Sequence, residues 1–120
     1  MFLIKAVSIE GLEYVEWGSQ AQLVCGATGR PDPPPSVDWY KNGRRMRSDA
    51  DRGVAITKNI ERNMLVSVMT IQSVRMSDAA EYTCQASGSD HATVVLNVVR
   101  STMPITTTRY TRPARGVLPP

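Results

Sequence analysis

The stretch Asp78-Ala79-Ala80-Glu81-Tyr82-Thr83-Cys84 says more about the fold than any other part of this chain. Its residues Ala80, Tyr82 and Cys84 share one parity, which is typical of a strand with one buried face. A second cysteine, Cys25, and a tryptophan, Trp39, lie upstream. Two cysteines are too few for a structural zinc site with four ligands. They leave either one disulfide or two free buried thiols.

The middle of the chain consists of short segments in which apolar and polar residues alternate. Turn-forming sequences separate these segments at residues 29–35, at Asn42-Gly43 and at residues 87–90. No stretch has a sustained helical period, so many short strands with frequent turns predict a sandwich or a barrel. The alternating apolar sets are Ala21, Leu23 and Cys25; Val37 and Trp39; Val54 and Ile56; Leu65, Met69 and Ile71; Ala80, Tyr82, Cys84 and Ala86; and Val94, Leu96 and Val98.

Together these features resemble the immunoglobulin superfamily, and within it the I-set. Four motifs carry the resemblance, and they span roughly residues 10–100. The chain departs from the family pattern at Ala80, where glycine is frequent, at Ser87, where asparagine is frequent, and at Trp17, where a charged residue is usual. The motifs are Leu23-Val24-Cys25, Val37-Asp38-Trp39-Tyr40-Lys41-Asn42-Gly43, Met69-Thr70-Ile71-Gln72-Ser73-Val74, and the stretch from Asp78 to Cys84.

The resemblance implies an all-β fold, an immunoglobulin-like two-sheet antiparallel β-sandwich. In that family a disulfide joins the sheets, a buried tryptophan packs against it, and a tyrosine two residues before the second cysteine bonds to the backbone. The resemblance therefore implies a Cys25–Cys84 disulfide. The core signature that it implies consists of Trp39, Leu23, Ile71, Asp78 and Tyr82.

Three segments are expected along the 120 residues. Residues 1–7 are apolar but lack the basic start of a secretory signal, so they suggest a lead-in strand or an added segment. Residues 8–100 are expected to form the I-set immunoglobulin-like domain, a size typical of one domain. Residues 101–120 are rich in Ser, Thr, Pro and Arg without a hydrophobic period, which predicts a disordered linker or stalk, native or added.

Composition and motifs argue against several classes of function. A net charge of +3 is too small for a nucleic-acid-binding domain. The sequence contains no apolar run long enough to insert in a membrane. His91, the only histidine, lies beside the polar turn at residues 87–90, where solvation of a turn explains these residues better than catalysis. Without a phosphate loop, a carboxylate pair or metal-ligand spacing, we expect no enzyme activity, no catalytic residue, no cofactor and no metal site.

A basic cluster follows the segment that contains Trp39. Five cations within twelve residues could hold heparin, heparan sulfate or an acidic partner through charge-assisted contacts. The alternative is a solvated face that Asp49 and Asp51 partly neutralise. The cluster consists of Lys41, Arg44, Arg45, Arg47 and Arg52.

Two further features are candidates for binding. Pro33 and Pro34 stiffen the loop before Trp39, and a stiff loop loses less entropy when it binds, although the loop could also serve only to bridge the sheets. Trp17 would be an interface anchor if it is exposed, since tryptophan is enriched at binding hot spots. It could instead pack on a neighbouring domain or on the edge of its own.

Three functions fit the sequence. The first is an extracellular, non-enzymatic recognition module of a cell-adhesion or receptor-type protein that binds either a different protein or a second copy of itself. The second is a secreted module with heparin affinity, since residues 66–71 and 77–87 resemble insulin-like growth factor binding protein-related immunoglobulin domains and the basic stretch resembles neuregulins. The third is a structural domain of a cytosolic muscle-type array, in which the same cysteines stay reduced. Disulfides persist in oxidising compartments, which favours an extracellular location.

Overall fold

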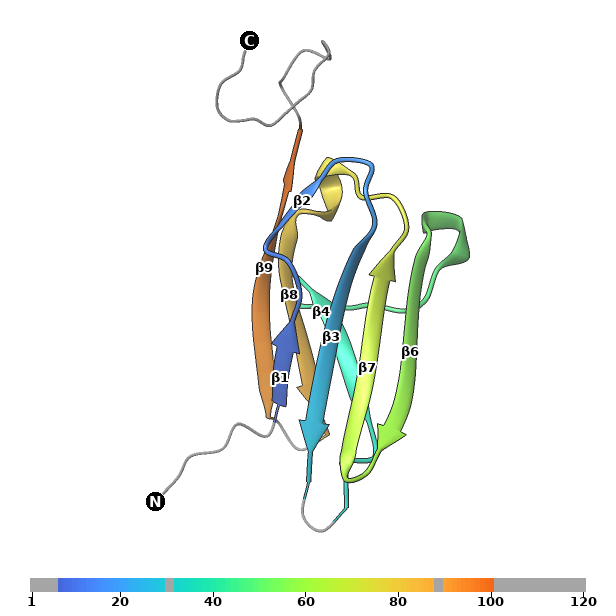
Figure 1. The fold of residues 1–120 in the computed structure, drawn as a ribbon, viewed down its shortest axis with the longest axis vertical. Helices are drawn as coiled ribbons and strands as arrows, with labels where there is room; N and C mark the ends of the chain where they lie inside the picture. Colours follow the sequence, from blue (N-terminus) through green and yellow to red (C-terminus); the bar gives the residue numbers. More distant parts are fainter. Residues whose placement is uncertain (1–6, 30–31, 88–89, 101–120) are drawn as a thin grey trace.

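Two β-sheets packed face to face make up the part of the chain that the structure describes (Figure 1). The computed structural model describes residues 7–29, 32–87 and 90–100. The expected tail at residues 101–120, and all of the lead-in except Val7, lie outside the described residues. Two short 3-10 helices, η1 (Ala50–Arg52) and η2 (Met76–Asp78), lie in the connections between strands.

The order of the strands is that of a sandwich. The four-stranded sheet has the order β1-β3-β7-β6 and is antiparallel throughout. The five-stranded sheet has the order β2-β9-β8-β4-β5 and is antiparallel except for β2, which runs parallel to β9. The predicted all-β sandwich is therefore confirmed, with one parallel pair in it. The strands are β1 (Val7–Glu10), β2 (Tyr14–Glu16), β3 (Ala21–Thr28), β4 (Val37–Lys41), β5 (Arg44–Arg45), β6 (Val54–Glu61), β7 (Met64–Ile71), β8 (Ala80–Ala86) and β9 (His91–Val99).

The parallel pair arises because one N-terminal segment serves both sheets. Strand β1 pairs with β3, the chain then crosses over, and β2 continues beside β9 (Figure 1). Gly11 stands at this crossing, where a Cβ atom would lie 2.5 Å from Leu23 Cδ2 and 3.0 Å from the Gln22 carbonyl oxygen. A larger residue would not fit without a shift, so glycine allows the crossing segment to lie close against β3.

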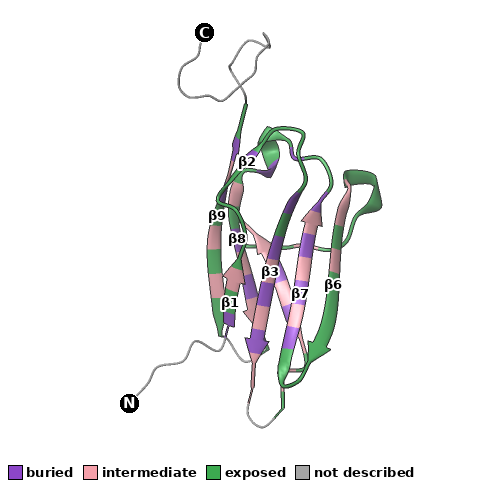
Figure 2. Cartoon of the chain, viewed as in Figure 1, coloured by how far each residue is buried: buried purple, intermediate pink, exposed green. Residues whose placement is uncertain are grey.

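Burial alternates along the central strands as the sequence pattern predicts (Figure 2). In β3 the buried side chains are those of Ala21, Leu23, Cys25 and Ala27, and the residues between them are more exposed. The same period holds in β7 and β8, so the inward faces of both sheets form one core. Burying a leucine or isoleucine side chain contributes about 1.5–3 kcal/mol relative to leaving it exposed. The core between the two sheets is therefore the main source of stabilising free energy.

A covalent bond and a hydrogen-bonded indole lie at the centre of that core. The disulfide between Cys25 and Cys84 joins β3 to β8, which confirms the expected pairing. Trp39 is 1% exposed, and its Nε1 donates to Ser67 Oγ at 2.9 Å. The Ser67 hydroxyl donates in turn to the Thr57 carbonyl oxygen at 2.9 Å. Ser67 has the same parity as Leu65 and Met69, so its side chain points into the core. Its buried hydroxyl accepts the hydrogen bond of the only polar atom in the Trp39 side chain.

A second polar arrangement closes the turn between β7 and β8. The Tyr82 hydroxyl donates to the Asp78 carbonyl oxygen at 2.6 Å, and both residues are buried. The Asp78 carboxylate accepts from the Arg75 backbone N–H at 2.8 Å, which caps η2. Burial, together with the nearby Asp78 carboxylate, raises the pKa of the Tyr82 hydroxyl above its ordinary value.

The raised pKa of Tyr82 predicts a loss of stability in alkali. Because the folded state holds this proton more tightly than the unfolded state, the stabilisation is complete below about pH 10, the ordinary tyrosine pKa, and falls at higher pH. We expect the free energy of unfolding to decrease by up to about 1.4 kcal/mol per pH unit above that point. Urea titrations from neutral pH to pH 11 measure it.

The matched variant for this measurement is Tyr82→Phe, which keeps the ring and removes the titrating group. At neutral pH it should lose about 1 kcal/mol, the usual contribution of one hydrogen bond. Above pH 10 the gap between the two proteins should close. A gap that stays constant across this range would contradict the assigned role of Tyr82.

Candidate functional site

The five cations of the predicted basic cluster do not converge on one point. Lys41 Nζ donates to the Ser77 carbonyl oxygen at 2.8 Å and lies 4.0 Å from Asp78 Oδ1. Arg45 Nη2 pairs with Asp38 Oδ1 at 3.0 Å. Two of the five are therefore engaged within the domain itself. Their charges are less available to a ligand than the sequence alone suggests.

The other three cations follow the path of the chain from β5 to β6. Arg44 is exposed on β5, immediately after the predicted Asn42-Gly43 turn. Both turn residues have positive φ, 49° and 85°, which is the geometry of a tight two-residue hairpin. Arg52 is exposed in η1, in the same turn as Asp51. Arg47 alone of the five both lines a pocket and forms no ion pair with a residue that the structure describes.

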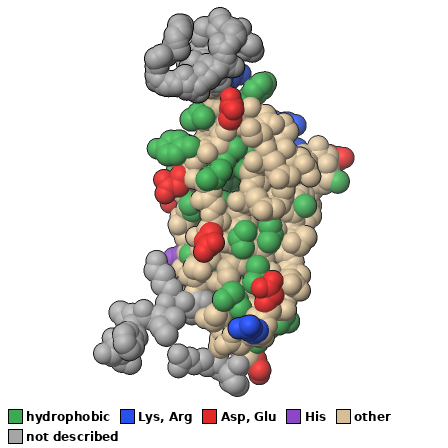
Figure 3. Space-filling model, viewed as in Figure 1, with side chains coloured by type: hydrophobic (Ala, Val, Ile, Leu, Met, Phe, Trp, Pro, Cys, Tyr) green, Lys and Arg blue, Asp and Glu red, His purple; other side chains and the backbone are tan. Residues whose placement is uncertain are grey.

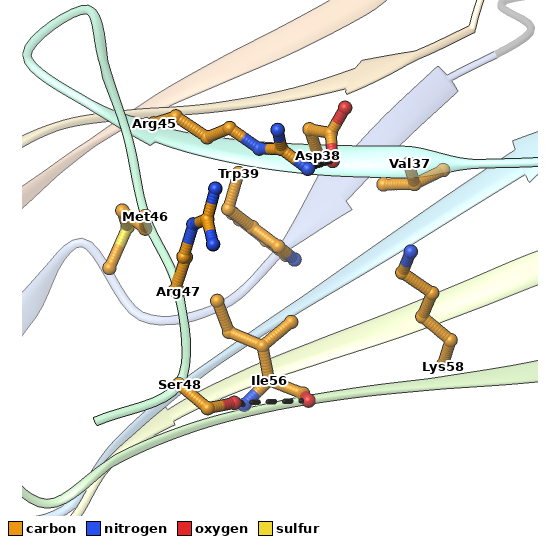
Figure 4. A pocket seen from close by; sticks show the side chains of 9 residues that line it. All are labelled: Val37, Asp38, Trp39, Arg45, Met46, Arg47, Ser48, Ile56 and Lys58. Carbon is orange, nitrogen blue, oxygen red and sulfur yellow. Dashed lines mark hydrogen bonds and ion pairs between the residues drawn. The ribbon is translucent and has the colours of Figure 1, made fainter. Parts of the chain in front are cut away.

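That setting is a pocket where the two sheets separate, between β4 and β6 (Figure 4). It has a volume of about 170 Å3. The Ser48 hydroxyl fixes one wall, since it accepts from the Ile56 backbone N–H at 2.9 Å and so ties the β5–β6 connection to the edge of β6. The residues that line the pocket are Val37, Asp38, Trp39, Arg45, Met46, Arg47, Ser48, Ile56 and Lys58.

The pocket has an apolar floor and an excess of positive charge. Figure 4 shows the side chains of Arg47 and Lys58 on either side of Trp39 and Ile56. Asp38 neutralises Arg45, and within the described part of the chain neither Arg47 nor Lys58 takes part in an ion pair. Two unbalanced cations beside apolar surface form a suitable site for a carboxylate on an aliphatic stem.

Lys58 was not among the residues predicted from the sequence. It stands on β6, away from the basic cluster, and lines the same pocket as Arg47 only because the connection from β5 folds back along that strand. No motif marks it, since an isolated lysine on an exposed strand is common.

The outer face of the five-stranded sheet offers a second surface. We use this name for the outward residues of β2, β9, β8 and β4. Thr83 pairs with both Tyr40 and Thr93, and its Oγ1 lies 3.0 Å from Thr93 Oγ1. Val95 and Tyr14 are 50% and 64% exposed, so apolar side chains stand in solvent on this face. The outer face includes Tyr14, Glu16, Tyr40, Glu81, Thr83, Thr93, Val95 and Val99, with Glu81 opposite Val95.

The remaining predicted binding residues lie elsewhere. Trp17 is 51% exposed at the end of β2, where its backbone N–H donates to the Val99 carbonyl oxygen at 2.7 Å. The Arg100 guanidinium lies over the Trp17 ring, 5.1 Å from its centre, so one face of the indole is already covered. Pro33 and Pro34 are half-buried between β3 and β4, in a loop of which residues 30–31 lie outside the described residues.

The described ranges, residues 7–29, 32–87 and 90–100, contain neither a candidate metal cluster nor a membrane-spanning helix. No group of three or more His, Cys, Asp or Glu side chains in these ranges could hold a metal ion. No helix in these ranges is long and apolar enough to cross a membrane.

Comparison with known families decides what this sandwich is. The family model described as the immunoglobulin domain matches residues 6–88, well over half of the chain. The chain belongs to the immunoglobulin domain family. The match covers both cysteines of the disulfide, Trp39 and Tyr82, so it includes the structural centre of this immunoglobulin domain.

Several curated proteins are similar to this immunoglobulin domain. A protein sidekick homolog of Caenorhabditis elegans is 35% identical over 68 residues, which are 57% of this chain and 2% of that protein. Neural cell adhesion molecule 1 of Mus musculus is 32% identical over 87 residues, 71% of this chain and 7% of that protein. Protein amalgam of Drosophila melanogaster is 33% identical over 86 residues, 71% of this chain and 25% of that protein. The immunoglobulin domain thus spans a quarter or less of these relatives.

Solved structures agree with the fold. A chain in the crystal structure of Dpr2 Ig1-Ig2 in complex with DIP-Theta Ig1-Ig3 has a TM-score of 0.64 at 22% identity, over 79% of this chain and 49% of that one. The structure of the N-terminal eight Ig domains of Down Syndrome Cell Adhesion Molecule has a TM-score of 0.60 at 25% identity, over 78% of this chain and 12% of that one.

Proposed function

We propose that this immunoglobulin domain is an extracellular, non-enzymatic recognition module of the I-set type, from a cell-adhesion or receptor-type protein, that binds another protein. Two of its relatives and structural neighbours are named as cell adhesion molecules, and another neighbour comes from a complex between two proteins with such domains. The disulfide supports an oxidising compartment and argues against the cytosolic array.

The outer face is the surface that we assign to this binding. The carrying observation is that Val95 and Tyr14 are half or more exposed on a sheet whose neighbouring outward residues are polar. An apolar centre with a polar rim is the usual build of a protein–protein interface, since it loses little hydration and gains packing. A heparin site on the basic cluster is the weaker candidate, because Lys41 and Arg45 are engaged by Ser77, Asp78 and Asp38.

Replacing Val95 with arginine tests the outer face. A charged, bulky side chain at this position would have to lose its hydration at the centre of the interface, so we expect binding to weaken at least tenfold, as is common for a central interface residue. The measurement is surface plasmon resonance of the domain against a panel of purified adhesion-type ectodomains, itself included.

Ala55→Arg is the matched control, because Ala55 is exposed on β6, in the other sheet, and the change adds the same charge. It should bind as the unaltered domain does. Equal binding by the Val95→Arg variant, or an equal loss in both variants, would remove the outer face from consideration.

A further inference from the structure

The edge of the sandwich that β1 and β2 form is acidic. Residues 7–16 contain Glu10, Glu13 and Glu16 and no lysine or arginine. These residues run along β1, the crossing and β2, and Figure 3 shows acidic side chains along this side of the molecule. Within the described residues, none of the three carboxylates takes part in an ion pair. Three unbalanced negative charges therefore line one edge.

The same edge also exposes apolar side chains. Leu12 is 72% exposed in the crossing between β1 and β2, and Tyr14 on β2 is nearly as exposed. We name this surface the acidic edge and define it by Glu10, Leu12, Glu13, Tyr14 and Glu16. It adjoins the outer face, since Tyr14 and Glu16 of β2 belong to both surfaces. Its carboxylates alternate with apolar groups, so it carries both kinds of surface that the pocket between β4 and β6 is built to receive.

The pocket lies on the opposite edge. Strands β1 and β2 begin the order of the two sheets, and β6 and β5 end it. We name the pocket side the basic edge and define it by Arg47, Lys58, Met46 and Ile56. The two edges are complementary in charge and in apolar character, and they face away from each other on one molecule, so they cannot meet within it.

We infer that a second copy of this chain docks its acidic edge on the basic edge. The carboxylate of Glu13 or Glu16 lies between the Arg47 guanidinium and the Lys58 ammonium, and the neighbouring apolar side chain covers Ile56 and Met46. The carboxylate then exchanges its hydrogen bonds with water for charge-assisted hydrogen bonds with these two cations. Beside the apolar side chains of the pocket, opposite charges attract more strongly than in open solvent. The contact goes beyond the proposed function, since the pocket is separate from Val95 on the outer face.

Two consequences follow from the geometry. The patches differ, so the contact is head-to-tail, and it extends copies into a row rather than closing a two-fold dimer. We expect the contact between these edges to bury less than the roughly 1,200 Å2 of a stable interface, so the association should be weak and depend on concentration. Its exposed charges make it sensitive to salt, because screening shortens to a few ångströms at about 1 M.

Paired charge reversals test the contact. In Arg47→Glu/Lys58→Glu both edges are acidic, and in Glu13→Lys/Glu16→Lys both edges are basic. Each variant alone should be monomeric by sedimentation equilibrium at concentrations where the unaltered domain associates, with association weakened at least tenfold. An equimolar mixture of the two should associate again, because every edge then meets its opposite. Recovery in the mixture also shows that both variants are folded.

Arg62→Glu/Arg75→Glu is the control, since it makes the same charge change at exposed positions that neither line the pocket nor belong to the basic cluster. It should associate as the unaltered domain does. A mixture that stays monomeric, a control that loses association equally, or an unaltered domain that is monomeric at about 1 mM would each overturn the proposal. The basic edge shares no residue with the outer face. Arg47→Glu/Lys58→Glu should therefore leave unchanged the binding that Val95→Arg weakens, and failure of the contact between copies leaves the outer face standing.

Discussion

Replacing both Cys25 and Cys84 with alanine lowers the free energy of unfolding by about 4 kcal/mol. The disulfide closes a loop with a sequence separation of 59, and without it the unfolded chain regains the conformations that this closure forbids. Both sulfurs are fully buried, so alanine is the appropriate replacement and leaves no unsatisfied polar group. Urea unfolding followed by far-ultraviolet circular dichroism measures the change.

The unaltered domain in the presence of a reductant is the control for this double variant. Both should unfold at nearly the same urea concentration, because both lack the covalent link. Domains of this size typically have a free energy of unfolding of about 5–15 kcal/mol. If this domain lies at the low end of that range, the loss would leave it only marginally stable. A change below 1 kcal/mol would mean that the unfolded chain is already restricted by other means.

Truncating Trp39 to alanine is expected to cost about 4 kcal/mol, the range for removing a large buried aromatic side chain. The indole is almost completely buried beside the disulfide, so its loss leaves a cavity that the two sheets cannot close. The change also removes the donor to Ser67 Oγ. Thermal and urea unfolding measure the effect.

The chain provides its own comparison in Trp17. This second tryptophan is half exposed, and its ring contacts Arg100 at the surface. Trp17→Ala should therefore cost less than about 1 kcal/mol, as is usual for surface substitutions. Equal losses in the two variants would show that burial in the structure does not describe the energetics of these residues.

Much of the fold could be predicted because it depends on local periodicity. Alternation places Leu23 and Cys25 on one face of a strand wherever that strand lies, and the spacing of Cys25, Trp39 and Cys84 is shared by a whole family. The direction of β2 could not be predicted in the same way, since a period of two is identical in parallel and antiparallel strands. It depends on the crossing at Gly11, which brings one segment from β3 to β9.

The candidate site was harder to predict, because it depends on which distant residues meet. Lys41 and Arg47 belong to the same run of cations in the sequence, yet Lys41 turns to Ser77 while Arg47 lines the pocket. Lys58 joins Arg47 through the path of the β5–β6 connection along β6. Ser67 was missed for a related reason, since a serine among apolar positions gives no sign that it bonds an indole from the other sheet.

The chain of hydrogen bonds from Trp39 through Ser67 to the Thr57 carbonyl oxygen sets the alignment of the two layers. Apolar contacts alone would let the two sheets slide over each other, because hydrophobic contacts are not directional and differ little in energy. A displacement of one sheet by one residue would leave the indole N–H and the serine hydroxyl buried without hydrogen-bond partners. Each unsatisfied group would cost about 1–3 kcal/mol. The single Ser67 hydroxyl in an otherwise apolar core thus fixes the position of one sheet relative to the other. Displacements that hydrophobic burial alone would tolerate break its hydrogen bonds and are destabilised.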